Sequence, residues 1–295
     1  MNDEKRQGGN LGVIGWPIAH SLSPAMQSAA IFDAGLDLSY IAMGVRPESL
    51  AAAVEGLKAL NFRGFNVTIP HKTSIIALLD ETEEDARRIG AVNTVVNEGG
   101  RLIGKNTDVT GFLNGFSRDG VGIFGKKAVV FGGGGAARAA IWGLLREGAA
   151  KISVGVRNEK KAREALFDLA SGSVAEVLSW DGEDFAASLG SADILVNTTP
   201  LGMTPQYDAA PPVDWSIVPS SAYVYDVIYT PSRTRFLKEA EARGHRTRNG
   251  AAMLVGQGAE AFFAWTGIRP REEVMERALL KALGEKEDGN GHGGS

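Results

Sequence analysis

A lysine and an aspartate in the first 110 residues stand where each could take part in acid–base chemistry. Lys72 ends the motif Asn66-Val-Thr-Ile-Pro-His-Lys72, which predicts a strand followed by the first turn of a helix. Because a cation in a first helical turn opposes the helix dipole, its presence there suggests a functional reason. Asp108 ends Asn106-Thr-Asp108, just before another predicted helix. The ordinary alternatives are a surface lysine and a helix N-cap, the latter contributing about 1 kcal/mol. The neighbouring His71 is the weaker candidate, since its side chain should point elsewhere.

A glycine-rich loop is the second chemical feature of the sequence. It joins a predicted strand (128–131) to a predicted helix (136–147), and it consists of Gly132, Gly133, Gly134, Gly135 and Ala136. Residues without bulky side chains let main-chain N–H groups approach a pyrophosphate, and the helix N-terminus adds partial positive charge. The pattern G-x-G-G-A-x-x-A is a variant of the dinucleotide fingerprint. A flexible turn is the alternative, but the strand–loop–helix context favours cofactor binding.

The residues after the next strand indicate which dinucleotide binds. Arg157 and Asn158 follow the predicted strand 151–156, where an NAD site usually has an acidic residue for the ribose 2′-hydroxyl. Arginine suits bidentate recognition of a 2′-phosphate. The alternative is a solvated surface arginine. The sequence therefore predicts NADP.

Hydride delivery to a ketone needs a proton donor at the developing alkoxide. No Tyr-x-x-x-Lys occurs in the chain. Cysteine is absent and the four histidines are not spaced as an HExxH pair, so a zinc route is improbable and no metal site is predicted. A lysine tuned by a carboxylate is the remaining option, which pairs Lys72 with Asp108.

Composition narrows the remaining function classes. The chain has 295 residues, 44% of them hydrophobic, and its 31 basic and 35 acidic residues give a net charge of −4. The balanced charge argues against nucleic acid as a partner, and no apolar run is long enough to span a membrane. Residues 1–10 lack an apolar signal-peptide core, so we expect a cytoplasmic protein.

Short apolar runs alternate with helical patterns, which predicts an α/β fold with mostly parallel sheets. Strands are predicted at 11–15, 38–45, 65–69, 92–96, 101–104, 128–131, 151–156, 194–197, 223–228 and 246–248, and helices at 24–34, 47–60, 72–79, 136–147, 159–170, 253–266 and 271–283. We place a first domain at 11–115 with 255–284, whose terminal helices pack back on it, and a second at 116–254. Residues 1–10 and 285–295 are predicted to be disordered.

Two further polar motifs have ordinary alternatives. Ser21 and Ser23 precede Pro24 at a predicted helix start, where their hydroxyls could hold a substrate carboxylate or one could simply cap the helix. Thr198 lies in Asn197-Thr-Thr-Pro-Leu-Gly-Met203 at the carboxyl end of a strand, where open α/β sheets bind ligands. A polar turn broken by proline and glycine explains that motif equally well.

Taken in order from about Leu11 to Leu283, these motifs resemble those of shikimate dehydrogenases. The matching motifs are Ser21-Leu-Ser23, Asn66-Val-Thr68-Ile-Pro-His-Lys72, Gly90-Ala-Val-Asn93-Thr94, Asn106-Thr-Asp108, Gly132–Ala136, Asn197-Thr-Thr-Pro-Leu-Gly-Met203 and the stretch from Gly250 to Gln257-Gly-Ala259. The resemblance implies NADPH-dependent reversible reduction of 3-dehydroshikimate to shikimate, in aromatic amino-acid biosynthesis. It also implies a Rossmann-type NADP-binding domain beside an α/β substrate domain, with the site in the cleft between them.

The resemblance also implies roles for individual residues. Lys72 would be the acid/base and Asp108 its partner. Substrate would be bound by Ser21 and Ser23 at its carboxylate, by Thr68, Asn93 and Gln257 at its hydroxyls, and by Tyr229, which closes the pocket. The NADP site would be lined by Gly132–Ala136, Arg157, Asn158, Thr198, Val227 and Gly250, with Glu84 as a weaker candidate.

The sequence departs from the family pattern at the cofactor strand. Where Asn-Arg-Thr is common, this chain has Val156-Arg157-Asn158, so one usual amide partner of the 2′-phosphate is missing and the choice of NADP over NAD is expected to be softer. Gly133 replaces a common alanine. A quinate/shikimate dehydrogenase with relaxed substrate and cofactor choice remains an alternative. The Lys72/Asp108 pair argues against a non-catalytic NADP-binding sensor, and Ser21-Leu-Ser23 with Asn106-Thr-Asp108 argues against a folate dehydrogenase with a catalytic lysine. We expect a small-molecule substrate and a monomer or homodimer.

Overall fold

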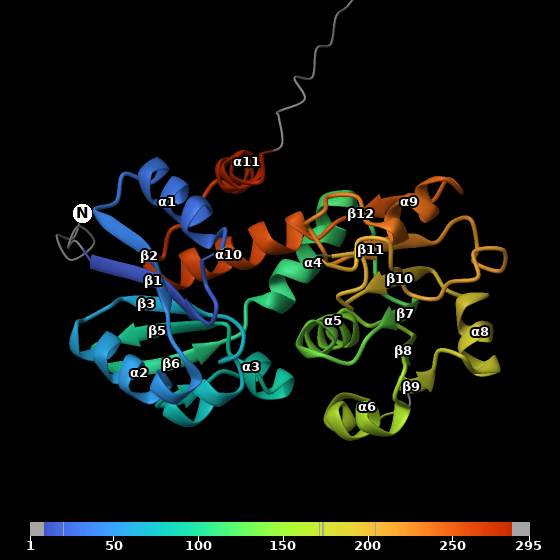
Figure 1. The fold of residues 1–295 in the computed structure, drawn as a ribbon, viewed down its shortest axis with the longest axis horizontal. Helices are drawn as coiled ribbons and strands as arrows, with labels where there is room; N and C mark the ends of the chain where they lie inside the picture. Colours follow the sequence, from blue (N-terminus) through green and yellow to red (C-terminus); the bar gives the residue numbers. More distant parts are fainter. Residues whose placement is uncertain (1–8, 20, 171, 173, 204, 285–295) are drawn as a thin grey trace, which may run out of the picture. The chain divides into compact units, whose positions relative to one another are not determined.

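The computed structural model describes residues 9–19, 21–170, 172, 174–203 and 205–284 (Figure 1). These residues form two compact units. The first contains the described residues through Ala86, then Ala91–Thr107 and those from Gly258 on. The second contains Arg87–Gly90 and Asp108–Gln257.

The first unit is built on a mixed six-stranded sheet of order β2-β1-β3-β5-β6-β4. Its strands are β1 (Gly9–Gly15), β2 (Leu38–Gly44), β3 (Gly64–Val67), β4 (Glu81–Thr82), β5 (Thr94–Glu98) and β6 (Arg101–Lys105). β1 pairs in parallel with β2 and β3, whereas β5 is antiparallel to β3 and β6. The β5–β6 hairpin turns at Gly99 and Gly100, both with positive φ, a conformation that glycine adopts without steric cost.

Helices cover both faces of the first sheet. They are α1 (Ser23–Asp33), α2 (Leu50–Ala59), the first residues of α3 (Glu84–Ile89), the end of α10 (Ala251–Thr266), α11 (Glu272–Ala282) and the 3₁₀ helices η2 (Pro47–Ser49) and η3 (Ser74–Leu78). The leucine and valine face of α2 packs on Phe65 and Val95 from β3 and β5. α1 packs against α11, and Trp265 near the end of α10 donates its indole N–H to the Val95 carbonyl at 2.9 Å. The terminal helices therefore pack on the first unit, as predicted (Figure 1).

The second unit is built on a six-stranded, fully parallel sheet of order β12-β11-β10-β7-β8-β9. Its strands are β7 (Lys127–Phe131), β8 (Lys151–Val156), β9 (Ala175–Ser179), β10 (Ile194–Asn197), β11 (Tyr223–Asp226) and β12 (Thr247–Arg248). Its helices are α4 (Asp108–Asp119), α5 (Gly135–Arg146), α6 (Glu159–Ala165), α7 (Phe167–Ala170), α8 (Glu183–Leu189) and α9 (Arg235–Glu241).

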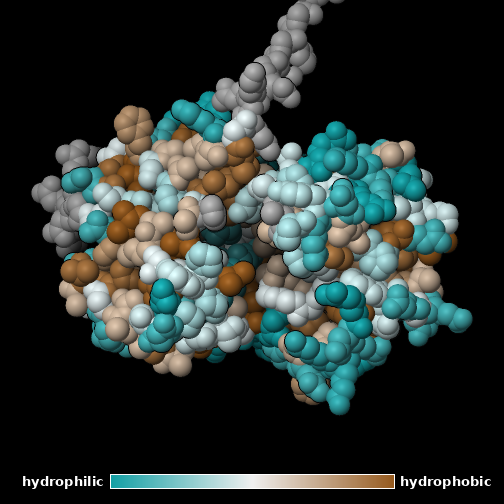
Figure 2. Space-filling view, in the orientation of Figure 1, coloured by the Kyte–Doolittle hydropathy of each residue, from teal (hydrophilic) through white to brown (hydrophobic). Residues whose placement is uncertain are grey.

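Alternation along β7 directs its side chains into two cores. Ala128 and Val130 pack with residues of α4, α5, α6 and α7, whereas Val129 and Phe131 pack with residues of α8 and α9 on the other face. The predicted α/β fold with a Rossmann-type parallel sheet is thus confirmed. Figure 2 shows hydrophobic residues scattered among hydrophilic ones on one face of the molecule, as is normal for a protein surface.

Several elements differ from the sequence prediction. The predicted helix 72–79 is a 3₁₀ helix that begins only at Ser74, and the predicted helix 159–170 is broken into α6 and α7 at Leu166. α3, α4, β9, α8 and α9 were not assigned ranges from the sequence. Gly9 and Asn10, expected in a disordered tail, belong to β1 because they pair with Leu38 and Ser39 of β2. The other expected disordered residues, 1–8 and 285–295, lie outside the described part of the chain.

The unit boundaries also differ from the domains placed at 116–254 and 255–284. α4 belongs wholly to the second unit, since Phe112 and Phe116 are buried in the core that α4 shares with α5. Phe112 stacks on the Tyr225 ring, and Phe116 meets the same ring edge-on. α10 passes from one unit to the other after Gln257.

Candidate functional site

The glycine loop after β7 has room for a ligand at its main chain. Gly132 has φ +111° and packs so closely that a Cβ would lie 2.8 Å from the Thr198 hydroxyl oxygen. Gly134 and Gly135 are exposed, and a Cβ on either would meet no described atom within 4 Å. Gly134 is the N-cap of the 12-residue helix α5 and, having no side chain, makes no side-chain cap hydrogen bond. The residues present therefore fit a pyrophosphate at the helix N-terminus.

Two other predicted cofactor residues shape the loops beside this one. The Thr198 hydroxyl donates to the Phe131 carbonyl at 2.6 Å, so it holds the end of β7 against the end of β10. The Val227 N–H donates to the Asn197 carbonyl at 3.0 Å. Gly250 approaches the same loop so closely that a Cβ would collide with the carbonyl oxygen of Val227. These residues lie at the carboxyl ends of neighbouring parallel strands, where the sheet edge carries ligand-binding loops.

Arg157 and Asn158 follow β8 at the same edge. Arg157 is exposed and its guanidinium lies 5.9 Å from the centre of the Trp180 ring, which orients the cation. The Asn158 side-chain oxygen accepts from the Lys161 N–H at 3.0 Å and so caps α6. Asn158 thus has a structural role that the sequence analysis did not assign, and its side-chain oxygen is committed to the helix.

A buried carboxyl group that was not predicted joins the loops after β10 and β11. Asp226 is fully buried and accepts from the Asn197 amide at 3.0 Å, the Ile228 N–H at 3.0 Å and the Thr234 hydroxyl at 2.6 Å. Burial raises the pKa of Asp226 to about 6, against these three hydrogen bonds, which lower it. The only sequence signal was its place in Tyr225-Asp-Val-Ile-Tyr229 at a strand end.

Lys72 lies in the turn between β3 and η3, not in a helix. Its carbonyl oxygen accepts from the Val92 N–H at 2.8 Å, which ties the lysine to the segment before β5. His71 is buried, and its Nε2 lies 2.7 Å from the Val45 carbonyl oxygen. This contact gives His71 a structural role and agrees with its lower rank as a candidate.

Asn93 is buried directly before β5 and braces the chain that leads into Asp108. Its side-chain oxygen accepts from the Thr107 N–H at 2.8 Å, and its amide nitrogen donates to the Thr107 hydroxyl at 3.0 Å. Asn106, also buried, donates its amide to the Ala91 carbonyl at 2.9 Å. Asp108 follows directly as the first residue of α4 and is half-buried.

The predicted substrate residues of the first unit gather at one edge of its sheet. Ser21 and Ser23 follow β1, and Thr68 follows β3, its N–H donating to the Ile14 carbonyl at 2.9 Å. Because β5 runs antiparallel to β3, Asn93, the residue directly before β5, lies at this same edge, and its carbonyl accepts from the Val67 N–H at 2.8 Å. Topology thus brings together residues that are far apart in the sequence: Ser21, Ser23, Thr68, Lys72 and Asn93.

The two serines do not form an ordinary helix cap. The N-cap of α1 is Leu22, which makes no side-chain cap hydrogen bond. The Ser21 hydroxyl accepts from the Ser23 N–H at a long 3.4 Å. Burial raises the pKa of Tyr40 in β2, while a hydrogen bond with the Ser23 side chain acts in the opposite direction. Ser23 therefore lies beside a chain of buried polar groups in which the Tyr40 hydroxyl donates to the Asn66 side-chain oxygen at 2.7 Å.

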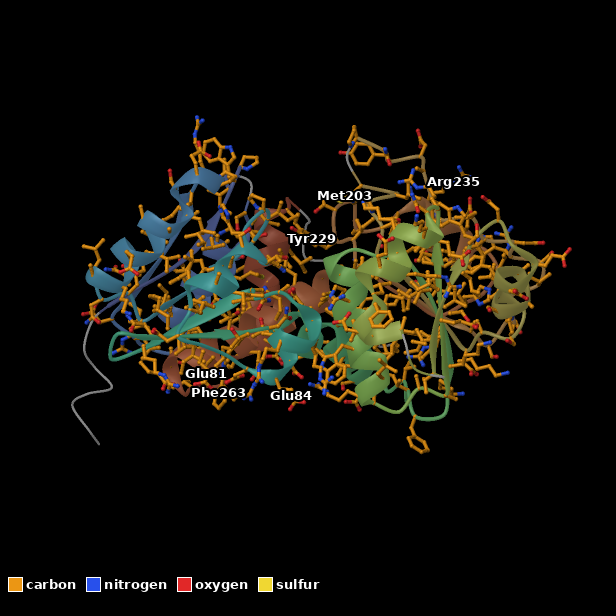
Figure 3. All side chains as sticks on the ribbon, turned by 90° about the horizontal axis from the view of Figure 1, so that it is seen from below. Glu81, Glu84, Met203, Tyr229, Arg235 and Phe263 are labelled. Atoms are coloured by element: carbon orange, nitrogen blue, oxygen red, sulfur yellow. The ribbon has the colours of Figure 1, made fainter. Side chains whose placement is uncertain are left out.

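The remaining predicted substrate residues belong to the second unit. Gln257 lies on α10, half-buried, and a Cβ at Gly111 of α4 would lie 2.8 Å from its main-chain nitrogen. Asp108 lies one turn before Gly111 on the same face of α4, since positions three apart share a helix face. Tyr229, labelled in Figure 3, comes from the loop after β11. Burial raises its pKa. Glu84, also labelled in Figure 3, begins α3 and is exposed.

Other features of the described residues do not compete with these positions. A cavity of about 370 Å³ lies at the amino ends of β7 and β8, beside Lys127, Lys151 and Ser188, and none of the predicted site residues line it. Among the described residues, no group of three histidine or acidic side chains is placed to hold a metal ion. No helix in the described part of the chain is long and apolar enough to cross a bilayer.

Comparison with known proteins gives the family. The shikimate dehydrogenase substrate-binding domain matches residues 13–95, and the shikimate 5′-dehydrogenase C-terminal domain matches residues 250–280. The shikimate dehydrogenase (NADP(+)) of Symbiobacterium thermophilum is 45% identical over 276 residues, which are 92% of this chain and 94% of that protein. Shikimate 5-dehydrogenase of Thermus thermophilus, solved in complex with NADP(H) and shikimate, is 36% identical with a TM-score of 0.84, over 93% of this chain and 100% of that one.

Two similar structures have other names. The 5-ketofructose reductase of a Gluconobacter strain is 37% identical with a TM-score of 0.85, over 93% of this chain and 99% of that one. Quinate dehydrogenase of Corynebacterium glutamicum, solved in complex with NAD, is 30% identical with a TM-score of 0.83, over the same shares. The family-model matches and the identity to a relative over more than nine-tenths of both chains decide the assignment: the chain belongs to the shikimate dehydrogenase family.

Proposed function

We propose that this protein is an NADP-dependent shikimate dehydrogenase that interconverts 3-dehydroshikimate and shikimate. The observation that carries the proposal is the gathering of Ser21, Ser23, Thr68, Lys72 and Asn93 at one edge of the first sheet. That edge offers hydroxyls and an amide for a polyhydroxylated acid, together with one amine that can exchange a proton. The high identity to a relative named for this activity supports the same conclusion.

Each residue then has a chemical task. The hydroxyls of Ser21 and Ser23 hold the substrate carboxylate, and Thr68, Asn93 and Gln257 bind its ring hydroxyls. Tyr229 closes over the ring. NADPH, when bound, supplies the hydride that forms the new C–H bond at the carbonyl carbon. The Lys72 ammonium donates the proton to the carbonyl oxygen, and the Asp108 carboxylate orients Lys72 and favours its charged form.

The cofactor residues of the second unit fit NADP. The open main chain of Gly134 and Gly135 receives the pyrophosphate, Ala136 begins the helix behind it, and Gly132 and Gly133 allow the tight turn. Arg157 binds the 2′-phosphate from its place beside Trp180, with Asn158 next to it. Thr198, Val227 and Gly250 form the loops on the other side, and Glu84 is a weaker candidate contact.

A second candidate is a quinate/shikimate dehydrogenase with relaxed substrate and cofactor choice. It is favoured by the 30% identity to a quinate dehydrogenase solved with NAD. Quinate carries the same carboxylate and ring hydroxyls, so the residues that bind these groups do not separate the two substrates. A non-catalytic NADP sensor is the candidate from a different class.

The deciding experiment is a matrix of two substrates and two cofactors. Shikimate and quinate are each oxidised with NADP+ and NAD+ by the purified protein. A kcat/KM at least about tenfold higher for shikimate with NADP+ than for any other combination supports the leading proposal. Comparable rates in all four cells support the relaxed enzyme, and cofactor binding without turnover supports the sensor. The predicted monomer or homodimer and the predicted cytoplasmic location stay predictions; light scattering on the same sample measures the former.

A further inference from the structure

Arg138 lies in the first turn of α5, directly after the glycine loop, yet it is fully committed to the protein. A guanidinium has five N–H donors. All five are used: Nε donates to the Ile89 carbonyl, Nη1 to the Ala165 carbonyl and Asp168 Oδ1, and Nη2 to the Arg88 carbonyl and Asp168 Oδ2. No donor remains for a cofactor phosphate, although a cation beside a phosphate loop would ordinarily be assigned to one.

The partners of Arg138 are helix ends, where a positive charge is stabilising. Arg88 and Ile89 form the last turn of α3, and Ala165 ends α6. Helix C-termini carry partial negative charge and unpaired carbonyls, so one guanidinium satisfies two of them at once. The bidentate pair with Asp168 fixes the plane of the fork, and the hydrogen bond from Arg138 lowers the pKa of Asp168. Only 16% of the Arg138 side chain is exposed.

The clamped end of α3 leads directly into the segment that holds the substrate-side residues. Gly90 ends the helix with φ +69°, and a Cβ there would lie 3.5 Å from Arg138 Nη2. Over the next three residues, the Ala91 carbonyl accepts from Asn106, the Val92 N–H donates to the Lys72 carbonyl, and the Asn93 side chain binds Thr107. One main-chain segment, residues 90–93, is therefore fastened at its start by Arg138 and along its length to the neighbours of Lys72 and Asp108.

We propose that Arg138 is a positioning residue that couples the two ligands of the enzyme. It clamps the Arg87–Gly90 turn to the first turn of the helix behind the phosphate loop, so that ordering of that helix by NADP also orders the Gly90–Asn93 segment and prepares Lys72 and Asn93 for the substrate. The inference rests on the proposed function. It requires that bound NADP tighten substrate binding and that this effect depend on the Arg138 contacts to α3.

The coupling can be measured without turnover, because NADP+ and 3-dehydroshikimate are both oxidised and cannot react with each other. Titration calorimetry gives the Kd of 3-dehydroshikimate with and without saturating NADP+, and the ratio is the coupling factor. In the wild-type protein we expect a factor of about fivefold or more. In Arg138→Lys, which has a compact ammonium with three donors in place of the planar fork, the factor falls toward one while the Kd of NADP+ alone changes by less than about threefold.

Two further variants separate the clamp from general damage to the unit. Arg163→Lys is the matched control, because Arg163 also donates to a main-chain carbonyl, that of Val177, and to the carboxylate of Glu159, neither of which belongs to α3. Asp168→Asn removes the acidic partner of Arg138 and leaves its carbonyl contacts in place. Both are expected to keep the wild-type coupling factor within about twofold.

Hydrogen exchange tests the path itself and needs only NADP+. In the wild-type protein, NADP+ is expected to slow exchange in peptides covering residues 87–93 as well as 133–138. In Arg138→Lys the protection of 133–138 remains and that of 87–93 is lost. A residue that merely stabilised the fold would raise exchange in both segments with and without the cofactor.

The outcomes of these experiments separate the Arg138 inference from the proposed function. Three results would overturn the inference and leave the proposed function standing. The first is a wild-type coupling factor of one, and the second is an Arg138→Lys protein that keeps the wild-type coupling factor. The third is an Arg138→Lys protein whose NADP+ binding is weakened equally with and without 3-dehydroshikimate. A wild-type protein that binds NADP+ and not 3-dehydroshikimate removes the proposed function instead. The exchange experiment then still shows whether Arg138 transmits cofactor binding to residues 87–93.

Discussion

The Val92 N–H and the Lys72 carbonyl share a hydrogen bond of 2.8 Å that joins the turn after β3 to the segment before β5. The bond uses only main-chain atoms, so it persists when the Lys72 side chain is changed. The position of the amine and the stability of the turn are consequently separable by mutation.

Lys72→Met is therefore expected to remove activity without unfolding the protein. Loss of a positioned proton donor should lower kcat by about 10²- to 10⁴-fold, while the KM for shikimate and the melting temperature change little. Steady-state kinetics and thermal unfolding measure these quantities. The control is Lys58→Met, which removes a lysine of the same unit that pairs with Asp80 at 3.6 Å and has no site role. A Lys72→Met enzyme with wild-type kcat would rule out the assigned acid/base.

Gly134→Ala and Gly135→Ala are expected to separate cofactor binding from stability. A methyl group at either position meets no described atom within 4 Å, and the φ of −90° at Gly134 is open to alanine, so the free energy of unfolding should change by less than about 1 kcal/mol. If the pyrophosphate lies against this main chain, the Kd for NADP+ rises by about tenfold or more, because a methyl group occupies its place.

Gly132→Ala is the contrasting variant in the same loop. Gly132 has a φ of +111°, and an added Cβ would lie 2.8 Å from the Thr198 hydroxyl oxygen. The substitution should therefore lower the free energy of unfolding by about 1–3 kcal/mol. Fluorescence titration with NADP+ and urea unfolding distinguish the two outcomes. Unchanged NADP+ affinity in both Gly134→Ala and Gly135→Ala would place the pyrophosphate elsewhere.

Arg157→Ala is expected to weaken NADP+ and spare NAD+. The exposed guanidinium beside Trp180 is the proposed ligand of the 2′-phosphate, a group that NAD+ lacks. We expect the KM for NADP+ to rise by about tenfold or more, equivalent to one charge-assisted contact of roughly 1.5–3 kcal/mol, with little change for NAD+. Lys160→Ala, a neighbouring exposed cation on α6, is the control. An equal effect on both cofactors would show that Arg157 does not recognise the phosphate.

Asp226→Asn is expected to change how stability depends on pH. The pKa of the buried carboxyl is raised to about 6, so between pH 4 and 6 the folded protein holds a proton that the unfolded chain has lost. The stability that the protonated Asp226 carboxyl contributes to the folded state is thus fully present below pH 4 and is lost as the pH rises through 6. The variant cannot ionise, so its stability relative to wild type should rise from pH 4 to pH 7 by on the order of 2 kcal/mol.

Urea unfolding of both proteins at pH 4.5 and pH 7.5 measures this difference of differences. Asp214→Asn is the control of opposite sign. Hydrogen bonds from the Ser216 hydroxyl and N–H lower the pKa of Asp214, so its contribution is present at neutral pH and lost on acidification. A difference between wild type and Asp226→Asn that is constant with pH would contradict the raised pKa.

Local sequence patterns were sufficient for elements that are marked by a short, continuous apolar run. Such runs predicted the positions of β7, β8 and β10 to within one residue, and the glycine loop was correctly placed before α5. Lys72 shows where this fails. Its carbonyl is bonded to Val92, twenty positions further along the chain, so the turn cannot begin the α-helix that its composition suggested.

The roles of Arg138 and Asn158 were not predicted, because each depends on contacts that form only in the fold. Arg138 occupies an unspecified position of the G-x-G-G-A-x-x-A pattern, but its partners Arg88 and Ile89 lie about fifty residues earlier, and nothing in the local pattern points to them. Asn158 was predicted as a cofactor ligand from its place after β8, and its capping bond to Lys161 depended on where α6 would begin. The sequence located the strand ends that carry the candidate site residues, whereas contacts that form only in the folded protein decide which side chains serve the scaffold.

The first unit takes its last segment from Gly258 onward, and the indole of Trp265 bonds to Val95 in the middle of its sheet. A chain truncated before Gly258 would keep every strand of the first sheet but lose the end of α10 and the whole of α11, which pack on it. The second unit, whose strands and helices α4–α9 lie in the unbroken stretch 108–257, would lose none of these elements. Loss of the last segment is therefore expected to expose apolar residues of the first sheet while leaving the second sheet complete.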